Sequence, residues 1–501
     1  MEKFLMLRWM VVTVGLLMSE QAVAADAVRI GLASLPPGNG NPYTSTARTS
    51  WYTWRATFDA LTQLGPKVEP VPALAVAWRN TSPTTWEFDL RQGVTFSNGE
   101  PFDAKTVMAT VNYLQSPAAA QESLIREVEN IAGLREIRPG TIEITTKAPD
   151  AMLPRQLTTL PMVAPAAWQA LGRDAFAFKP VGTGPFAVES WGEAKVVLKA
   201  FPGSWRAPKS AHLEILALPE TTSRIQALQT GQIHVASEIG PEDIDILKAA
   251  GLNVYQRPAS SVEVIAMHAK EGTPLGDTRV RLALNYAIDH RGITEALLHG
   301  LVPPPTQVTP STNPEYNPEL TAYPYDPAAA KALLTEAGFG NGFKFTMVMS
   351  SGTSGSHMRA TLEKVAADLA AVGVTMTIRP VPWSQYVRGV LQGEWLGEAF
   401  NFEYETMPTG EALRPFRLHS CTWAHPWYCD LETQPLIAEA KITFDPARRR
   451  DLVHRIQKNY RDKAAAILLF EQIGLDGVSP KLAGYDQMNG IIPYQDLVVA
   501  P

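Results

Sequence analysis

The sequence contains little cysteine and no surplus of basic charge. Cysteine occupies 2 of the 501 positions, and 44 lysine and arginine residues stand against 50 aspartate and glutamate residues, for a formal net charge of −6. So few cysteines exclude a scaffold held together mainly by disulfides. Proteins that bind nucleic acid usually carry a basic patch or stripe, so the mildly acidic balance argues against nucleic acid as a partner.

Long hydrophobic runs are missing after residue 25. A membrane-spanning helix needs roughly 20 apolar residues, and no run there approaches that length. The N-terminus combines the basic residues Lys3 and Arg8 with a short apolar run and the small residues Ala22 and Ala24. This pattern is typical of a cleavable signal peptide, with a tethering helix as the alternative. We predict that residues 1–24 are removed on export to the periplasm. Because no cysteine follows that site, we expect a mature protein that is not lipidated.

The familiar signatures of catalysis are also missing. The run at residues 352–356 departs from a nucleophile elbow at its last position. The glycines of residues 338–342 follow an expected helix, whereas a phosphate-binding loop precedes one. No zinc or calcium motif occurs, and the closest histidines, His419 and His425, are only weak candidates for a metal site. We therefore predict a protein that is not an enzyme and uses no cofactor, with a periplasmic hydrolase as a remote alternative.

Helical and alternating patterns follow one another along the chain and predict an α/β fold. The mature chain opens with an apolar strand at residues 28–33. Large apolar residues recur at spacings of three and four over residues 51–64, which predicts a helix there. A further helix is expected over residues 358–372, ended by Gly373 and followed directly by a strand at residues 374–378.

The two cysteines lie close together in the sequence. Cys421 and Cys429 are eight positions apart, and an oxidising compartment favours a disulfide between such a pair. A bridge that closes so short a loop stabilises the fold by about 2–3 kcal/mol on the chain-entropy model. We predict this disulfide in the exported protein.

Five segments, taken in order, carry a resemblance that covers essentially the whole mature chain. They are residues 86–99, 180–186, 227–233, 277–289 and 325–338. Together they resemble the peptide/nickel-binding family (family 5) of periplasmic solute-binding proteins of ABC transporters. Within them, we expect Gly182 and Gly184 to bring a loop against a strand, and Arg281 to form a framework salt bridge. The segments therefore identify a scaffold, and the ligand site must be argued separately.

The resemblance implies a two-lobed α/β periplasmic-binding-protein (Venus-flytrap) fold with an extra sub-lobe. Lobe I is expected at residues 26–45, 161–255 and 470–501, the sub-lobe at residues 46–160, and lobe II at residues 256–469. The hinges between the lobes are expected near residues 253–261 and 467–474. Ligand that contacts both lobes only in the closed form would stabilise closure.

The resemblance also points to two stretches that would contact ligand. The first is the loop of residues 41–46, where Thr44, Ser45 and Thr46 offer hydroxyl and backbone groups. The second begins at Trp383, which stands where peptide-binding relatives have an aromatic residue. In those relatives a tryptophan precedes, by three residues, an acid that holds the peptide amino terminus. Alignment without gaps places Phe402 and Glu405 at these positions.

Other candidates in the second stretch are less firmly placed. The arginines that hold a peptide carboxylate in relatives are replaced by Val390 and Ala399, and further arginines are the candidates to substitute for them. These are Arg388, Arg414 and Arg417. Tyr404 and Trp423 complete the predicted ligand-binding set. The alternatives are that Trp383 and Trp423 pack within the protein and that Glu405 is an ordinary surface residue.

The function implied by the resemblance is solute capture for import. A monomeric periplasmic receptor would bind short peptides or another amine-bearing small solute and deliver it to an inner-membrane ABC permease and its ATPase. The alternatives are a receptor for a nickel chelate, an opine or a sugar derivative, and a sensory receptor that takes no part in import.

Overall fold

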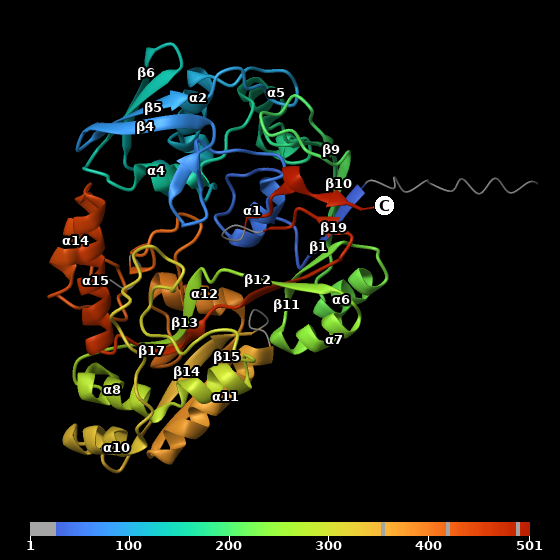
Figure 1. Cartoon of the computed structure of the whole chain (residues 1–501). Coiled ribbons are helices and arrows are strands. Elements are labelled where there is room, and N and C mark those ends of the chain that lie inside the picture. Colours follow the sequence, from blue (N-terminus) through green and yellow to red (C-terminus); the bar gives the residue numbers. More distant parts are fainter. Residues whose placement is uncertain (1–26, 352–355, 417–420, 487–490, 501) are drawn as a thin grey trace, which may run out of the picture.

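The computed structural model describes residues 27–351, 356–416, 421–486 and 491–500. Its first large unit is a seven-stranded sheet (Figure 1). In spatial order the strands are β12 (Asn253–Arg257), β18 (Gly474–Val478), β11 (Val235–Ile239), β1 (Ala27–Leu32), β10 (His212–Ala217), β9 (Lys195–Ala200) and β8 (Phe186–Trp191). β1 is parallel to both of its neighbours, β10 and β11, and the helices α6 (Thr221–Gln229) and α7 (Ile244–Ala249) belong to this unit.

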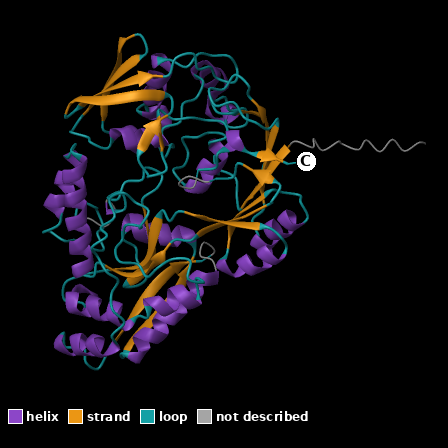
Figure 2. Cartoon of the chain, in the orientation of Figure 1, coloured by secondary structure: helices purple, strands orange, loops and turns teal. Residues whose placement is uncertain are grey.

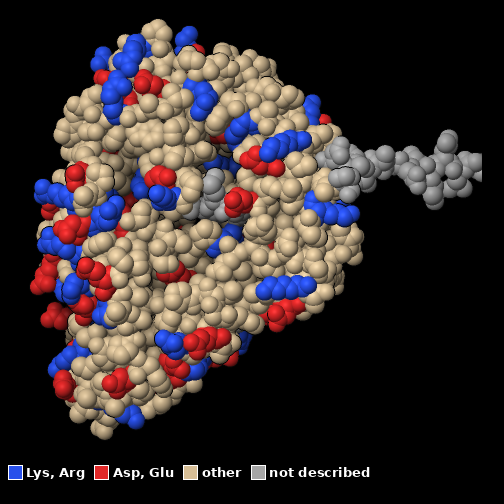
Figure 3. All heavy atoms as spheres, viewed as in Figure 1, with Lys and Arg blue, Asp and Glu red and all other residues tan. Residues whose placement is uncertain are grey.

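The second large unit is a five-stranded sheet. In spatial order its strands are β15 (Val374–Val381), β14 (Phe343–Ser350), β16 (Ala399–Glu405), β13 (Ser261–Met267) and β17 (Ala466–Glu471). The surrounding helices are α8 (Thr278–Ala287), α9 (His290–Ala296), α10 (Pro327–Glu336), α11 (Ser356–Ala371) and α12 (Trp383–Gln392). α14 (Gln434–Ile442) and α15 (Pro446–Asp462) stand together at one side of this unit (Figure 2). Charged side chains gather along that same side of the surface (Figure 3).

A smaller unit carries two further sheets. β4 (Ala75–Ser82), β5 (Thr85–Leu90), β7 (Thr141–Thr146) and β6 (Ile131–Arg138) form an antiparallel sheet, and β2 (Thr62–Leu64) pairs with β3 (Pro70–Pro72). The helices here are α1 (Arg48–Trp54), α2 (Ala104–Leu114), α3 (Ile125–Val128), α4 (Leu153–Gln156) and α5 (Pro165–Phe176). Its buried apolar residues are continuous with those of the seven-stranded sheet. Across the described parts of the chain, no helix has both the length and the apolar character that a membrane crossing requires.

Local sequence signals explain the β14–α11–β15 unit. β14 and β15 are parallel and in register from Phe343 opposite Val374 to Ser350 opposite Val381. α11 connects them and buries Leu362, Val365 and Leu369 completely. The chain leaves the helix through Gly373, whose φ of +90° favours glycine. The helix and strand predicted on either side of Gly373 are thus confirmed, as is the α/β class.

The helix predicted over residues 51–64 is wrong in extent. α1 ends at Trp54, and the chain then turns before it enters β2. Trp54 and Phe58 are both fully buried, and periodicity cannot distinguish a helix from another structure when a segment is buried on every side. Gly182 packs directly on this turn, because a Cβ there would lie 2.0 Å from the carbonyl oxygen of Thr57.

The partner expected for Arg281 is also wrong. Its guanidinium donates to backbone carbonyls of the turn before α8 and of the turn after α15, including those of Leu275 and Lys463 at 3.0 and 2.9 Å. No carboxylate pairs with it in the described parts of the chain. The framework role holds, because these bonds tie α8 to the turn that follows α15. Five N–H donors in a fixed fork suit several carbonyls as well as one carboxylate.

Two short connections join the large sheets. Residues 258–260 run from β12 to β13, and residues 472–473 run from β17 back to β18. Both leave the five-stranded sheet at the edge where its parallel strands β14, β15 and β16 end. The molecule is therefore two-lobed, with the carboxyl ends of parallel strands facing the junction, which is where open α/β sheets bind ligands. The residue boundaries expected for each lobe stay a prediction that this sheet membership supports.

Buried histidines make the stability of this fold sensitive to acid. Burial is the main cause that lowers the pKa of His234, His268 and His290 from 6.5 to about 4. Nδ1 of His234 accepts a 3.0 Å hydrogen bond from the backbone N–H of Arg29, which joins β11 to β1. Protonation would remove that acceptor. Because the unfolded chain binds more protons between these pKa values, this contribution to stability is complete above pH 6.5 and is lost as the pH falls toward 4.

We therefore expect urea unfolding to show a lower free energy of unfolding at about pH 5 than at about pH 7.5. His234→Asn should reduce this difference, because the amide oxygen of asparagine lies close to the position of Nδ1, can accept the same bond and does not titrate. His299→Asn, at an exposed position, is the matched control and should leave the difference unchanged. Equal stability of the wild-type protein at the two pH values would contradict the prediction.

Candidate functional site

A hollow of about 460 Å³ lies between the two halves of the molecule, and we call it the cleft pocket. Its lining residues come from segments that are far apart in the sequence. They are Ser45, Thr46, Ala47, Thr49 and Ser123 on one side, and Glu403, Glu405, Met407 and Arg414 on the other. The predicted candidates Ser45, Thr46 and Glu405 are thus brought together. Figure 3 shows the surface hollowed between the upper and lower halves, with charged residues at its rim.

Local hydrogen bonds hold the loop that supplies Ser45 and Thr46. Asn41 accepts at its side chain from the N–H of Tyr43 at 3.1 Å, and its carbonyl accepts from the hydroxyl of Thr44 at 3.0 Å. The hydroxyl of Ser45 accepts from the N–H of Ala47, where α1 begins. These bonds point the loop at the cleft pocket, but they use the Thr44 hydroxyl internally. Thr44 itself is outside the lining of the pocket.

The parity of β16 determines which of its side chains reach the pocket. Successive residues of a strand point to opposite faces. Glu403 and Glu405 therefore share one face at the end of the strand, where they line the pocket. Tyr404 points the other way and is completely buried. Phe402 lies on that second face too, with its ring centroid 5.3 Å from that of Trp427. The structure therefore separates Phe402 and Tyr404 from the pair of acids.

The two carboxylates are held in place but lie at the surface of the pocket. Glu403 accepts a hydrogen bond from the hydroxyl of Ser261 on the neighbouring strand β13. Oε1 of Glu405 accepts from the N–H of Met407 at 2.9 Å. The guanidinium of Arg414 reaches the backbone carbonyl of Glu405 at 3.4 Å. Two acids and one arginine in this pocket favour a solute that carries positive charge.

The other predicted residues surround α12 and lie outside the lining of the cleft pocket. Trp383 is 56% exposed and stacks its ring on Tyr386, with centroids 5.5 Å apart. Arg388 pairs with Glu394 at 3.4 Å on the surface. Nε1 of Trp423 donates to the carbonyl of Val390 at 3.3 Å, and this bond attaches the loop between Cys421 and Cys429 to α12. These contacts favour packing for Trp423 and leave one face of the Trp383 ring open.

The weak metal candidates do not gain support. His425 is exposed, while His419 lies outside the described residues, as does Arg417. In the ranges that the structure describes, no three histidine, cysteine, aspartate or glutamate side chains come together in a way that could hold a metal ion.

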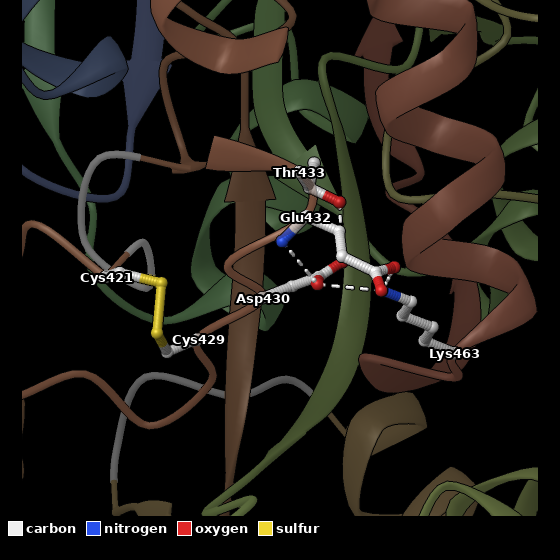
Figure 4. The surroundings of a disulfide bond; sticks show 6 residues. All are labelled: Cys421, Cys429, Asp430, Glu432, Thr433 and Lys463. Carbon is white, nitrogen blue, oxygen red and sulfur yellow. Dashed lines mark hydrogen bonds and ion pairs between the residues drawn. A yellow bond between two sulfur atoms is a disulfide. The ribbon is translucent and has the colours of Figure 1, made fainter. Parts of the chain in front are cut away.

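The predicted disulfide is present and lies at the start of an ion-paired segment (Figure 4). Cys421 and Cys429 are bonded, and the next residue, Asp430, receives the ammonium of Lys463 at 2.8 Å. Burial raises the pKa of Asp430, but the hydrogen bonds from Lys463 and Thr433 lower it more, so the pKa is below its usual value. The disulfide therefore closes the loop of residues 421–429, and the ion pair of Asp430 attaches the end of that loop to Lys463, directly after α15.

Removing the disulfide should therefore weaken the fold. We expect the Cys421→Ser, Cys429→Ser double variant to lose about 2–3 kcal/mol of unfolding free energy, because the unfolded chain regains loop entropy. Urea unfolding of the oxidised protein, the reduced protein and the double variant measures this. The reduced wild type should match the variant, and an unchanged midpoint would show that the loop is held by its ion pairs alone.

Glu403 and Ser123 are pocket residues that were not identified from the sequence. Glu403 could have been found from its position, because residues two apart on a strand share a face and Glu405 was already a candidate. Ser123 had no such signal. Its hydroxyl donates to the carbonyl of Thr44 at 2.8 Å, a contact across 79 positions that only the folded chain shows.

Comparisons with known proteins agree with this architecture. Residues 69–410 match the family described as bacterial extracellular solute-binding proteins, family 5 Middle. The glutathione-binding protein GsiB of Escherichia coli (strain K12) is 29% identical over 422 residues, which cover 80% of each chain.

Solved structures show the same fold over almost the whole chain. DppA from Helicobacter pylori, a periplasmic binding protein in complex with the peptide STSA, is 22% identical and superposes with a TM-score of 0.79, over 95% of this chain and 98% of that one. NikA from Staphylococcus aureus in complex with Ni(L-His)2 is 16% identical, with a TM-score of 0.76 over 95% and 100% of the two chains.

Proposed function

The chain belongs to family 5 of the bacterial extracellular solute-binding proteins, and from this we propose that it is the periplasmic receptor of an ABC importer for short peptides or another amine-bearing small solute. The observation that carries the proposal is the cleft pocket, where Glu403 and Glu405 of one lobe face Ser45 and Thr46 of the other. The names of the relatives that bind glutathione and a peptide agree with this solute class.

The pocket suits an ammonium group. An ammonium has three donors and no acceptor, and the acids of β16 supply acceptors that carry charge. Charge-assisted hydrogen bonds are roughly twice as strong as neutral ones. The hydroxyls of Ser45 and Thr46 can accept further hydrogen bonds from the opposite side, so a bound solute would join the two lobes.

Hinge closure follows from this placement. A solute that contacts both sides of the cleft pocket binds the closed form better than the open form, and it shifts the population by that difference in affinity. Residues 258–260 and 472–473 are the connections that must bend. The closed form would then be what an inner-membrane permease, powered by its ATPase, recognises.

The identity of the solute can be tested directly. The protein is purified from its own periplasm, denatured, and the released small molecules are identified by mass spectrometry. Peptides or another amine are the expected result. A sugar derivative without an amine, or a metal complex, would contradict the proposal. Loss of uptake of the identified solute in cells that lack the protein would separate import from sensing.

We also propose that the mature protein starts at Ala25. The basic start, short apolar run and small residues before this position support cleavage there. N-terminal sequencing and intact mass of the periplasmic protein measure the start, and a mass equal to that of residues 25–501 without an added acyl chain is the expected result.

A further inference from the structure

The hydroxyl of Ser261 connects a pocket acid with the junction between the lobes. Ser261 is the first residue of β13, directly after the connection of residues 258–260, and it is completely buried. Its hydroxyl donates to Glu403, which lines the cleft pocket. The same hydroxyl oxygen lies 3.2 Å from the amide oxygen of Gln472, in the second connection. One buried side chain thus touches both the proposed amine site and a segment that must bend when the cleft opens.

Two acceptors compete for this hydroxyl, because it has a single proton. Oε1 of Glu403 and Oε1 of Gln472 both lie within hydrogen-bond distance, so Ser261 can donate fully to one of them at a time. A hydrogen bond to a charged acceptor is roughly twice as strong as a bond to a neutral one. When no solute is bound, the hydroxyl therefore donates to the carboxylate of Glu403.

An ammonium group in the cleft pocket changes this competition. It has three donors, so an ammonium held by Glu405 can also donate to Glu403, which lies two residues away on the same face of β16. Its positive charge compensates the charge of the carboxylate, and Glu403 loses its advantage over the amide of Gln472 as an acceptor. The hydroxyl of Ser261 is then free to turn to Gln472.

The bond between Ser261 and Gln472 depends on the angle of the hinge. Ser261 is fixed in β13, whereas Gln472 lies in a connection that bends, so their 3.2 Å approach belongs to one relative position of the lobes. The two halves touch in that position, because Arg155 of the smaller unit donates to the carbonyls of Thr409 and Gly410, after β16, at 3.4 and 3.3 Å. A hydrogen bond donated to Gln472 therefore stabilises the closed arrangement.

We propose that Ser261 couples occupation of the amine site to closure of the hinge, an inference that rests on the proposed function. The ammonium of a bound peptide releases the hydroxyl from Glu403, and the hydroxyl then donates to Gln472 and holds the closed arrangement. Ser261 acts through these two residues and is a positioning residue. This coupling acts from within one lobe and adds to the contacts of the solute with Ser45 and Thr46 in the other.

Spin labels on the two halves of the full mature protein measure the hinge. The sequence has two cysteines, which are bonded to each other, so the exchanges Thr81→Cys and Arg455→Cys supply the free thiols for labelling. Both positions are exposed, the first in β4 and the second in α15. Double electron–electron resonance gives the ratio of closed to open molecules, without solute and with the tightest-binding member of a set of tripeptides with free ends.

Removing the acceptor in the pocket should close the hinge without any solute. Glu403→Leu releases the hydroxyl, and we expect the solute-free ratio of closed to open molecules to rise about fivefold, the effect of one hydrogen bond. Adding Ser261→Ala to this variant should abolish the rise. An unchanged ratio in Glu403→Leu would overturn the proposal, because a contact that merely holds β16 in place gives the hinge no reason to close.

The bound peptide tests the second half of the coupling. At a saturating concentration of the peptide, Ser261→Ala and Gln472→Met should each lower the ratio of closed to open molecules about fivefold. The double variant should lower it no further, because both changes remove one shared bond. Without solute, Ser261→Ala should match the wild type. Ser237→Ala, at another buried serine, in β11, is the matched control and should match the wild type in both conditions.

Failure of this proposal and failure of the proposed function are distinguishable. If the peptide closes the wild type and Ser261→Ala to the same extent, the peptide remains the solute and the coupling through Ser261 is overturned. If no tripeptide binds, the assignment of a peptide as solute and as trigger is overturned. The solute-free comparison of Glu403→Leu with and without Ser261→Ala then still decides whether the hydroxyl controls the hinge.

Discussion

Asp476→Asn is expected to lower the free energy of unfolding by about 3–5 kcal/mol, because it leaves a buried arginine without its counter-charge. Arg257 ends β12, directly before one connection between the lobes, and Asp476 lies in β18, directly after the other. Their charged groups are 3.2 Å apart, and both side chains are almost completely buried. The pair therefore fastens together the two strands from which the hinges leave.

Further hydrogen bonds around this pair increase the free energy of unfolding that is lost when the pair is broken. Oδ2 of Asp476 accepts from the hydroxyl of Tyr485 at 3.0 Å, and Oδ1 accepts from the N–H of Glu238 at 3.1 Å. Arg257 also bonds the hydroxyl of Tyr52 on α1. Burial lowers the pKa of Arg257, but the charge of Asp476 outweighs it and raises the pKa. Although the variant removes the charge of Asp476, the guanidinium still stays charged, because arginine is not deprotonated in proteins, and it lies in a place that water hardly reaches.

Urea unfolding at neutral pH measures this effect. Asp462→Asn is the matched control, since Asp462 pairs with Lys458 on the surface, with both side chains about half exposed, and such pairs contribute roughly 0–1 kcal/mol. Replacing both members, with Arg257→Met and Asp476→Asn together, should recover part of the loss. A change below about 1 kcal/mol in Asp476→Asn would show that the pair does not hold the junction.

Much of the fold was predictable because its signals are local. The burial stripe of α11, its end at Gly373 and the strand that follows need no information from the rest of the chain. The prediction of a helix through the turn after Trp54 was wrong for the opposite reason, because that turn depends on a distant part of the chain. It is defined by the close approach of Gly182, more than 120 positions away, and its own residues, 55–61, are all buried. The partners of Arg281 come from the distant end of α15 in the same way.

The candidate site divides along similar lines. The resemblance indicated Ser45, Thr46 and Glu405, and the fold brings all of them to one pocket. Phe402 was paired with Glu405 by counting three residues along a strand, and an odd spacing places two side chains on opposite faces.

Glu405→Gln should weaken binding of an amine-bearing solute by about tenfold or more, since it removes the charge from a charge-assisted hydrogen bond but keeps the shape of the side chain. The amide can still accept from the N–H of Met407, so the end of β16 should stay in place. Calorimetry with the tightest-binding member of a set of tripeptides with free ends measures the change, and Glu394→Gln, on the surface beside Arg388, is the control.

The same tripeptide acetylated at its N-terminus tests whether Glu405 holds the ammonium group. If Glu405 holds the ammonium, wild type and Glu405→Gln should bind the acetylated peptide equally weakly, because the variant and the acetyl group remove the same interaction. Unchanged affinity of Glu405→Gln for the free peptide would place the amine elsewhere. Glu403 would then be the next acid to change, because it shares the face and lines the same pocket, although its carboxylate already accepts from Ser261.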